Sequence, residues 1–389
     1  MKIKVGFFYG GRSVEHEVSV ISALQAMHAI SKDKYEVVPV YITKQGVFYT
    51  GEALLDIDNY KDMKALLQQC KQIMIEFDGN NRLLIKYPLS KFSNNVITTL
   101  DVAFPVIHGT NGEDGSLQGY FESICIPYAG CDVLSSALGM DKVVSKKLLK
   151  EAGIPVLDCI WFYSTDWLKD KNSIIEKIEK EVGYPAIVKP ANTGSSVGVK
   201  KAANRDELEE AVNEAKSFAH KVLVEKMVVN LREINCSVLG DFESAKPSVC
   251  EEPVSSKDIL TYQDKYMSSG TKGMSGATRQ IPANLPEEVS KEIQTLAVDT
   301  FKTLGCSGVV RIDFMIDRDT DTVYVNELNT IPGSLAFYLW EATGLSFEGL
   351  MDEMVKLALK KGREKEQLMF TYDTNLLSLQ GGLKGGIKK

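Results

Sequence analysis

The chain reads VVRIDFMI at residues 309–316 and TVYVNELN at residues 322–329, and this stretch decides the fold class. Both runs are short, apolar and rich in β-branched residues, which predicts two β-strands. Each run also carries two polar residues spaced two apart, so both side chains of a pair point to one face of their strand. The pairs are Arg311 with Asp313 and Glu327 with Asn329.

These four polar groups need partners, because burying them unpaired on apolar strands costs free energy. Asp313, Glu327 and Asn329 offer carboxylate and amide oxygens, the hard ligands that Mg²⁺ prefers, and Mg²⁺ often shares its ligand shell with phosphates. Arg311 beside them is suited to stabilise a developing oxyanion. The alternative interpretation is an internal salt bridge between Arg311 and the two acids.

Two lysines are candidates for binding phosphates. Lys189 ends the apolar strand 186–189 and precedes Pro190, which cannot continue strand pairing. The loop GSSVG at 194–198 follows, and its N–H and hydroxyl donors are suited to lie over phosphates. Lys142 is either a second phosphate ligand or an ordinary solvated helix lysine. The P-loop pattern G-x-x-x-x-G-K-[ST] is absent, which excludes that class of ATP-binding proteins.

Two polar, glycine-rich loops follow apolar strands in the first third of the chain. The loop at 10–19 reads GGRSVEHEVS, where paired glycines before a helix favour anion binding and Ser19 is the expected helix N-cap. Glu15 in this loop indicates that an ammonium group is also held there. The loop at 108–115 reads HGTNGEDG, at the strand end where open α/β sheets bind ligands. The alternatives are an ordinary βα turn and a purely structural His108.

Strand and helix signals alternate through most of the chain, as in βαβ units, and predict an α/β fold. Residues 135–153 are predicted to form one basic helix, ended by Gly153 and Pro155. The stretch 255–280 is polar, rich in glycine and serine, and longer than an ordinary loop, which is typical of a functional lid. The residues after Gly362 are rich in glycine and predict a flexible end.

The composition excludes several classes of protein. The formal net charge of −7 argues against a nucleic-acid-binding protein, whose surface has a basic surplus. No run approaches the roughly 18 apolar residues that a membrane span requires. The first apolar run ends at the glycine-rich loop without a cleavage site, so it is interpreted as a buried strand rather than a signal peptide. The seven cysteines, with no C-x-x-C pair, predict reduced thiols and a cytoplasmic protein.

Taken in order, these segments resemble the D-alanine–D-alanine ligases, a family of the ATP-grasp superfamily. The resemblance rests on GGRSVEHEVS, HGTNGEDGSLQG, MDK, VKPANTGSSVG, DKY and RIDFMID…NELNTIPG, which occur in this order. It implies an ATP-grasp fold of three α/β domains, 1–138, 139–230 and 231–365, with the active site between them. The third domain would include the lid 255–280, called the ω-loop in this family, and 366–389 would be a tail without a counterpart.

The resemblance also assigns roles to residues of this chain. ATP would be bound by Lys142 and Lys189 at its phosphates, by Ser195 and Ser196 in the flap over them, and by Glu225 and Glu233 at the adenine and ribose. Two Mg²⁺ or Mn²⁺ ions would be held by Asp313, Glu327 and Asn329. The first D-alanine would contact Glu15, Val18, His108 and Glu113. Arg311 and the backbone of Gly333 would form the oxyanion hole, Lys265 would reach the transferred phosphate, and Tyr266 would link Ser195 to Glu15.

The activity that this resemblance implies is ATP-dependent ligation of two D-alanines through a D-alanyl phosphate, for peptidoglycan precursor synthesis. Its partners would be small molecules, without nucleic acid or membrane, and the enzyme would be a cytoplasmic homodimer. Two alternatives remain open. One is a ligase that joins D-alanine to a different second substrate such as D-serine, or makes another dipeptide, in resistance or secondary metabolism. The other is a catalytically silent relative that binds nucleotide.

The chain departs from the family pattern after Gly333, where relatives carry a serine that holds the carboxylate of the second substrate. Residues 334–340 read SLAFYLW, and Tyr338 falls at the place of that serine. A tyrosine hydroxyl can donate to a carboxylate, so Tyr338 is the candidate for the second subsite, which its bulky neighbours would narrow or reshape. The alternative is that this run is a turn of a core helix. The ω-loop also carries a longer stretch, 268–279, than most relatives.

Overall fold

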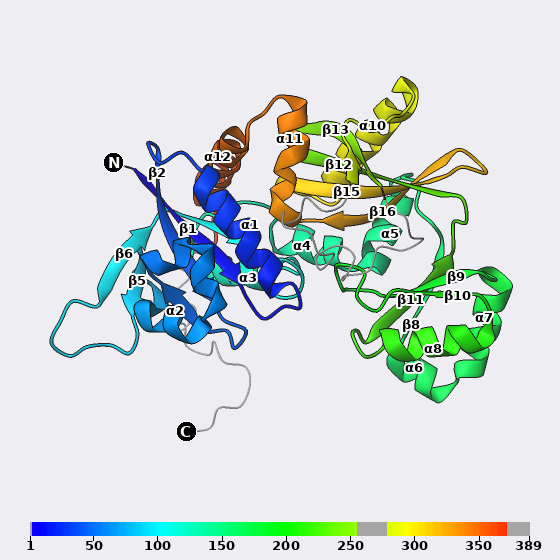
Figure 1. The fold of residues 1–389 in the computed structure, drawn as a ribbon, viewed down its shortest axis with the longest axis horizontal. Helices are drawn as coiled ribbons and strands as arrows, with labels where there is room; N and C mark the ends of the chain where they lie inside the picture. Colours follow the sequence, from blue (N-terminus) through cyan, green and yellow to red (C-terminus); the bar gives the residue numbers. More distant parts are fainter. Residues whose placement is uncertain (1, 255–277, 372–389) are drawn as a thin grey trace, which may run out of the picture.

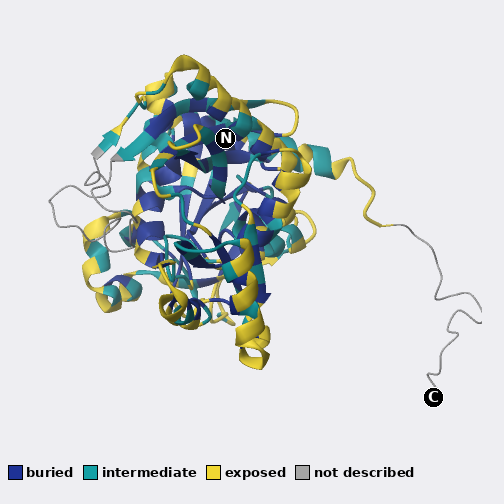
Figure 2. Ribbon diagram, turned by 90° about the vertical axis from the view of Figure 1, so that its right-hand side faces the viewer, coloured by how far each residue is buried: buried dark blue, intermediate teal, exposed yellow. Residues whose placement is uncertain are grey.

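The computed structural model describes residues 2–254 and 278–371. Its strands form three sheets that follow one another along the chain, with helices packed around them (Figure 1). Figure 2 shows that buried residues concentrate in the sheets and exposed residues on the surrounding helices and loops. The α/β class predicted from the alternation of elements is therefore confirmed. Among the described residues, no helix combines the length and apolar character needed to cross a membrane.

The first sheet has seven strands in the order β6-β5-β4-β3-β2-β1-β7. β1 (Ile3–Gly10) pairs in parallel with β2 (Tyr35–Ile42) and β7 (Val102–Val106), so the loops after β1 and β7 leave the sheet at the same edge. The other strands, β3 (Phe48–Thr50), β4 (Lys71–Phe77), β5 (Arg82–Lys86) and β6 (Val96–Leu100), pair antiparallel. The helices of this part are α1 (His16–Ala29), η1 (Glu52–Leu55), η2 (Ile57–Lys61), α2 (Met63–Gln69) and α3 (Ser116–Ser123).

Helix α1 begins three residues before Ser19, so the prediction that Ser19 is the N-cap is wrong. The chain turns into the helix earlier because Ser13 Oγ accepts a hydrogen bond from Glu15 N at 3.1 Å. Inside the helix, the Ser19 hydroxyl donates to Glu15 O at 3.0 Å and accepts from His108 N at 3.0 Å. Ser19 therefore joins the two glycine-rich loops instead of capping the helix.

The second sheet has four strands in the order β10-β9-β11-β8, and all of them pair antiparallel. The strands are β8 (Cys159–Tyr163), β9 (Ala186–Pro190), β10 (Lys200–Ala202) and β11 (Lys221–Lys226), and the helices are α6 (Ser164–Lys169), α7 (Lys171–Glu181) and α8 (Arg205–Ala215). Among the described strands, the parallel pairing that βαβ units imply occurs in the first sheet, whereas the strands of the second and third sheets pair antiparallel with one another. Alternation alone does not fix strand direction, because a helix can also return the chain to an antiparallel neighbour.

The single helix predicted over 135–153 is wrong, because the chain forms α4 (Val133–Met140) and α5 (Lys142–Glu151) instead. Asp141 separates the two helices, and its side chain accepts hydrogen bonds from the backbone of Val143 and Val144. The backbone N–H of Lys142 donates to Ala191 O at 2.9 Å and so leaves the helical pattern. This break places Lys142 at the start of α5, beside the loop after β9.

The third sheet has five antiparallel strands in the order β14-β13-β12-β15-β16. Its strands are β12 (Leu231–Gly240), β13 (Ala245–Val254), β14 (Thr278–Gln280), β15 (Gly308–Asp317) and β16 (Thr322–Asn329). Helix α10 (Glu287–Thr303) packs on this sheet, and η3 (Gly333–Ala336), α11 (Phe337–Thr343) and α12 (Phe347–Glu366) follow it. Two of these strands contain the polar pairs of the sequence.

Helix α12 returns the end of the chain to the first sheet. Leu350, Met351 and Val355 share one hydrophobic core with Val5 and Phe104 of that sheet. Tyr35 also donates its hydroxyl hydrogen to Asp352 Oδ1 at 2.7 Å. The segment that connects β16 to α12 is therefore fixed at both ends, between the third sheet and the first.

Candidate active site

Three loops meet around the carboxylate of Glu15, which is only 4% exposed. Glu15 lies in the loop after β1, directly before α1. Ser195, in the loop after β9, donates from Oγ to Glu15 Oε1. A Cβ atom added to Gly109, in the loop after β7, or to Gly194 would lie 2.6 or 2.8 Å from Glu15 Oε2, so glycine permits this approach. The structure thus brings together predicted residues that are far apart in the sequence.

The flap residue Ser195 contacts this carboxylate, and the first turn of α1 directly follows Glu15 in the chain. Ser195 and Ser196 have φ values of +51° and +57°. This left-handed conformation costs of order 1–3 kcal/mol for a residue with a Cβ atom, and such strain concentrates where ligands bind. Val18, in the first turn of α1, is buried. The family resemblance predicts that its side chain lies beside the methyl group of the first D-alanine.

His108 and Glu113 hold the segment that leads from β16 to η3. Glu113 accepts from Ile331 N at 2.8 Å with Oε1 and from Gly109 N at 2.8 Å with Oε2. His108 Nδ1 lies 2.7 Å from Ile331 O, and because a carbonyl only accepts, Nδ1 carries the proton. Both backbone groups of Ile331 are therefore fixed by residues predicted for the first subsite.

Burial shifts the pKa values of these two side chains in opposite directions. It lowers the pKa of His108 to about 4, so the imidazole is neutral at pH 7. Burial and the neighbouring charge of Glu15 raise the pKa of Glu113 to about 8, although two backbone N–H groups favour its ionised form. The positive charge of Arg311 also acts on both groups, so Glu113 lies within electrostatic range of Glu15 and of Arg311.

Ser22 of α1 completes this network, although no motif contains it. Its Oγ lies 2.8 Å from His108 Nε2 and accepts from Ser334 N at 3.0 Å. Because the proton of His108 is on Nδ1, the Ser22 hydroxyl donates to Nε2. The only signal in the sequence is that Ser22 follows Val18 by four residues and so shares its face of the helix.

The turn at Gly333 is held in an unusual conformation. Ser334, Leu335 and Ala336 have φ values of +51°, +54° and +50°, which are costly for residues with a Cβ atom. All three are buried, and the hydrogen bond from Ser334 to Ser22 ties the turn to α1. The backbone of Gly333 is thus positioned by a constrained turn, as an oxyanion hole requires.

Lys142 connects the second sheet region to the third sheet. It is 8% exposed, so the interpretation as a solvated helix lysine is wrong. Its Nζ donates to Thr193 O at 2.7 Å and lies 3.2 Å from Glu327 Oε2. The lysine therefore lies between the flap loop and one of the predicted metal ligands.

Glu225 on β11 is 1% exposed and pairs with two lysines. Lys189 Nζ contacts Glu225 Oε1, and Lys146 Nζ lies 3.0 Å from Glu225 Oε2. Burial would raise the pKa of Glu225, but the two ammonium groups outweigh it and lower the pKa to about 2. Lys146 is absent from the predicted set, although its position one helical turn after Lys142 indicated that the two share a face.

Lys189 also reaches the third sheet, where its Nζ donates to Asn326 Oδ1 at 3.1 Å. Burial would lower the pKa of Lys189, but the charges of Glu225, Glu327 and Glu233 raise it above its ordinary value. Glu233 itself is exposed on β12. Lys189 is therefore a permanently charged cation between the two sheets, with Glu233 within its electrostatic range.

The predicted metal ligands lie on facing positions of two strands. Asp313 on β15 is the cross-strand partner of Glu327 on β16, and Arg311 is the partner of Asn329. Arg311 donates to both oxygens of Asp313, at 2.6 and 2.8 Å, and Asn329 Nδ2 donates to Asp313 Oδ2 at 3.0 Å. The internal salt bridge considered as the alternative is thus present between Arg311 and Asp313, whereas Glu327 pairs with Lys142.

This donor set still fits a magnesium ion. Side chains of direct cross-strand partners have Cβ atoms about 5 Å apart, so Asp313 and Glu327 offer oxygens to a common space. The amide oxygen of Asn329 is the third donor of the kind that Mg²⁺ prefers. Arg311 and Lys142 neutralise the two carboxylates here, and both cations would move apart from them on metal binding.

Two family models and a curated relative match most of this chain. The family model described as D-ala D-ala ligase N-terminus matches residues 4–131, and the one described as D-ala D-ala ligase C-terminus matches residues 148–356. The D-alanine–D-alanine ligase of Thermosipho melanesiensis is 43% identical over 380 residues, covering 98% of this chain and 99% of that protein. The chain belongs to the D-alanine–D-alanine ligase family.

Two solved structures of such ligases are similar to this one. The VanG D-Ala:D-Ser ligase of Enterococcus faecalis gives a TM-score of 0.77 with 32% identity, covering 92% of this chain and 100% of that chain. The D-alanine–D-alanine ligase of Bacillus anthracis, solved in complex with ATP, gives a TM-score of 0.65 with 26% identity, covering 93% and 99%. The ATP-grasp fold expected from the family resemblance is therefore confirmed.

The segment in which this ligase departs from the family pattern forms α11. Phe337 stacks on Phe347 with ring centroids 4.4 Å apart, and Trp340 Nε1 donates to Ser237 Oγ at 3.1 Å. These two bulky side chains therefore pack against other parts of the protein. Tyr338 has a polar contact, in which its hydroxyl donates to Glu251 Oε2 at 3.2 Å. The run is thus a core helix turn that presents one tyrosine to a polar cluster.

Lys265 and Tyr266, with most of the predicted ω-loop 255–280, lie outside the described residues. The described part of the predicted link between flap, first loop and Tyr266 is the hydrogen bond from Ser195 to Glu15. The roles of Lys265 and Tyr266 stay predictions from the family resemblance.

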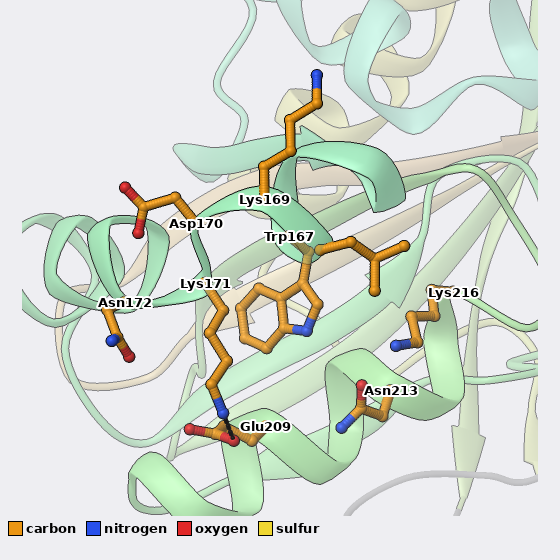
Figure 3. Close-up of a pocket in the computed structure, with 9 residues that line it drawn as sticks. Trp167, Lys169, Asp170, Lys171, Asn172, Glu209, Asn213 and Lys216 are labelled. Carbon is orange, nitrogen blue, oxygen red and sulfur yellow. Dashed lines mark hydrogen bonds and ion pairs between the residues drawn. The ribbon is translucent and has the colours of Figure 1, made fainter.

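A separate cavity of about 410 Å³ lies in the part of this ligase built on the second sheet (Figure 3). Lys171 Nζ pairs there with Glu209 Oε2 at 2.7 Å. The cavity is lined by Trp167, Leu168, Lys169, Asp170, Lys171, Asn172, Glu209, Asn213 and Lys216. None of these residues belongs to the predicted site, and we assign the cavity no role in the reaction.

Proposed function

We propose that this protein joins two D-alanines to D-alanyl-D-alanine at the expense of ATP, for peptidoglycan precursor synthesis. The observation that carries the proposal is the position of Glu113. One of its carboxylate oxygens accepts from Gly109 N, beside Glu15, the predicted ammonium ligand. The other accepts from Ile331 N, two residues before Gly333 of the predicted oxyanion hole, which supports one site for both groups. Membership of the D-alanine–D-alanine ligase family supports the same reaction.

In the first step, the carboxylate of the first D-alanine attacks the γ-phosphorus of ATP, and ADP leaves. Glu15 holds the ammonium group of this D-alanine, with Val18 beside its methyl group. Lys142 and Lys189 neutralise the charge of the phosphates as they exchange their present partners, Glu327 and Glu225, for phosphate oxygens. The product is D-alanyl phosphate.

In the second step, the amine of the second D-alanine attacks the carbonyl carbon of D-alanyl phosphate, and inorganic phosphate leaves. Negative charge develops on the carbonyl oxygen, and Arg311 with the Gly333 backbone is placed to stabilise it. The guanidinium of Arg311 keeps its charge throughout, because arginine is not deprotonated in proteins. The constrained turn at Gly333 keeps its backbone donor in place.

Asp313, Glu327 and Asn329 would hold Mg²⁺ or Mn²⁺, two ions by the family resemblance, which neutralises charge on the phosphates when bound. Ser195 and Ser196 would close over ATP, and Glu225 with Glu233 would contact its adenine and ribose. We further propose that the enzyme is a cytoplasmic homodimer. Its seven cysteines are all free, in keeping with a reducing compartment.

The test is to supply the purified protein with ATP, Mg²⁺ and D-alanine, and to measure released phosphate together with the mass of the product. We expect one phosphate for each D-alanyl-D-alanine. A second reaction with equal D-alanine and D-serine separates the alternative activity, and we expect mainly D-alanyl-D-alanine. Formation of D-alanyl-D-serine as the main product would assign the second subsite to D-serine, and no phosphate release would overturn the proposal.

A further inference from the structure

The polar face of the third sheet extends beyond the predicted metal and oxyanion residues. Glu327 faces Asp313, Asp313 faces Asn235 on β12, and Asn235 faces Glu251 on β13. Direct cross-strand partners point to the same face, so these side chains form one polar row across four strands. Arg279 on β14 faces Pro253, two residues after Glu251, and therefore lies on this same face.

Glu251 is the centre of a cluster at the far end of this row, and it is 1% exposed. Tyr338 donates its hydroxyl hydrogen to Glu251 Oε2 at 3.2 Å, and Asn235 Nδ2 donates to the same oxygen at 3.4 Å. Arg279 Nε lies 3.3 Å from Glu251 Oε1. A buried carboxylate thus fixes one tyrosine and one arginine.

Arg279 is also held by an aromatic ring, with its guanidinium carbon 4.2 Å from the centre of the Tyr338 ring. The Arg279 side chain is 26% exposed, so it is oriented by Glu251 and Tyr338 and remains accessible from solvent. A cation fixed in this way, with donors beyond those that its partners use, is suited to bind a carboxylate.

The position of this cluster matches the geometry of the second step. In the strand order of the third sheet, the predicted metal ligands Glu327 and Asn329 lie on β16, on one side of β15, whereas Glu251 and Arg279 lie on β13 and β14, on its other side. Arg311 points to the same face of β15 as Asp313, which the register joins to Glu251 through Asn235, so the cluster lies on the face that carries the oxyanion ligand. An amino acid bound there by its carboxylate would direct its amine toward the carbonyl group at Arg311.

We propose that Arg279, oriented by Glu251 and Tyr338, binds the carboxylate of the second amino acid and so selects acceptors with a free carboxylate. The proposal rests on the proposed ligase function and adds a specificity residue to it. It also accounts for the departure at α11, because Tyr338 supports the arginine where relatives use a serine.

The experiment compares Arg279→Gln with wild type at saturating ATP, fitting separate KM values for the two D-alanine subsites. Loss of a charge-assisted pair is expected to raise the KM of the second subsite about 10- to 100-fold. The KM values of the first subsite and of ATP are expected to change less than about 2-fold, because the proposal gives Arg279 no contact with either ligand and distant surface charges have weak effects. Arg279→Lys, which keeps the charge, is expected to restore part of the affinity.

The matched control is Arg232→Gln, which removes an arginine paired with Glu252, Nε to Oε1 2.8 Å, next to Glu251 in the sequence. We expect both KM values of this control to stay at the wild-type level. D-Alaninamide lacks the carboxylate and serves only as an acceptor, so with wild type its second-subsite KM should be higher than that of D-alanine. In Arg279→Gln the two KM values should become similar.

An unchanged second-subsite KM in Arg279→Gln would overturn the proposal while leaving the ligase function intact. An equal rise of all KM values would also overturn it, because this result indicates a structural role. A wild-type protein that releases no phosphate with D-alanine would overturn the ligase function and this proposal together.

Discussion

Replacing Glu225 by glutamine removes the counter-charge of two lysines in the second sheet. The two ammonium groups of Lys189 and Lys146 lower the pKa of Glu225 to about 2 against the opposing effect of burial. The ordinary pKa of glutamate is about 4.3, and a difference of about 2 units corresponds to about 3 kcal/mol. The folded-state pKa is depressed, so this stabilisation is present above about pH 4.3 and is lost as the pH falls through about 2.

At pH 7 the stabilisation from Glu225 is therefore complete, and the glutamine variant loses it. The variant also leaves two lysines without their buried partner, and removing one partner of a buried ion pair typically costs about 3–5 kcal/mol. We expect Glu225→Gln to destabilise the second-sheet region by this amount. We also expect the difference from wild type to shrink below about pH 4, where glutamate begins to lose its advantage.

Unfolding in urea, followed by tryptophan fluorescence, measures the stability of the second-sheet region. Trp161 lies on β8 and Trp167 on α6, and the third tryptophan, Trp340, lies on α11. The control is Glu179→Gln, which removes the partner of Arg205 on the surface and is expected to change the unfolding midpoint little. If Glu225→Gln unfolds at the same urea concentration as this control, the ion-pair reasoning is refuted.

Three further predictions concern activity and pH. Glu327→Gln should remain folded and lose about 100-fold or more in kcat, as measured by phosphate release, and near-normal turnover would favour the salt-bridge interpretation. The raised pKa of Glu113, about 8, implies stability that is complete below about pH 4.5 and lost as the pH rises to 8, so urea midpoints should fall across this range less steeply in Glu113→Gln. The third prediction concerns Lys265, which lies outside the described residues. Lys265→Ala should lower kcat more than it weakens ATP binding measured without D-alanine. A loss of ATP affinity with unchanged kcat would make Lys265 a ground-state contact only.

Local patterns were sufficient to predict strands β15 and β16 and the polar pairs on them. The alternation in β15 and β16 places Arg311 with Asp313 and Glu327 with Asn329, and the register confirms that the pairs face each other. A period of two is a property of each strand by itself, so no knowledge of distant residues is needed. The direction of strand pairing in the second and third sheets was not predictable in this way, because it depends on how the connections cross the sheet.

The residues missed at the site have roles that depend on distant partners. Ser22 matters because His108, after β7 of the first sheet, and Ser334, in η3 after the third sheet, both reach it. Arg279 is ordinary in its own segment and gains a role only from Glu251 and Tyr338. No local period or motif encodes such contacts, and only the folded chain brings these groups together.

The Ser19 prediction failed for a related reason. A serine before an apolar run is a sound N-cap signal, but here Ser13 forms the turn that starts the helix earlier. Tertiary contacts then use the Ser19 hydroxyl to join the loops after β1 and β7.

The most direct test of the central claim follows oxygen from the carboxylate of D-alanine. The reaction is run with D-alanine labelled with ¹⁸O in its carboxylate, unlabelled ATP and Mg²⁺, and the released phosphate is analysed by mass spectrometry. Attack of the carboxylate on the γ-phosphate and loss of phosphate from D-alanyl phosphate predict one ¹⁸O atom in each phosphate. Phosphate without ¹⁸O, released together with D-alanyl-D-alanine, would contradict the acyl phosphate and the roles that we assign around it.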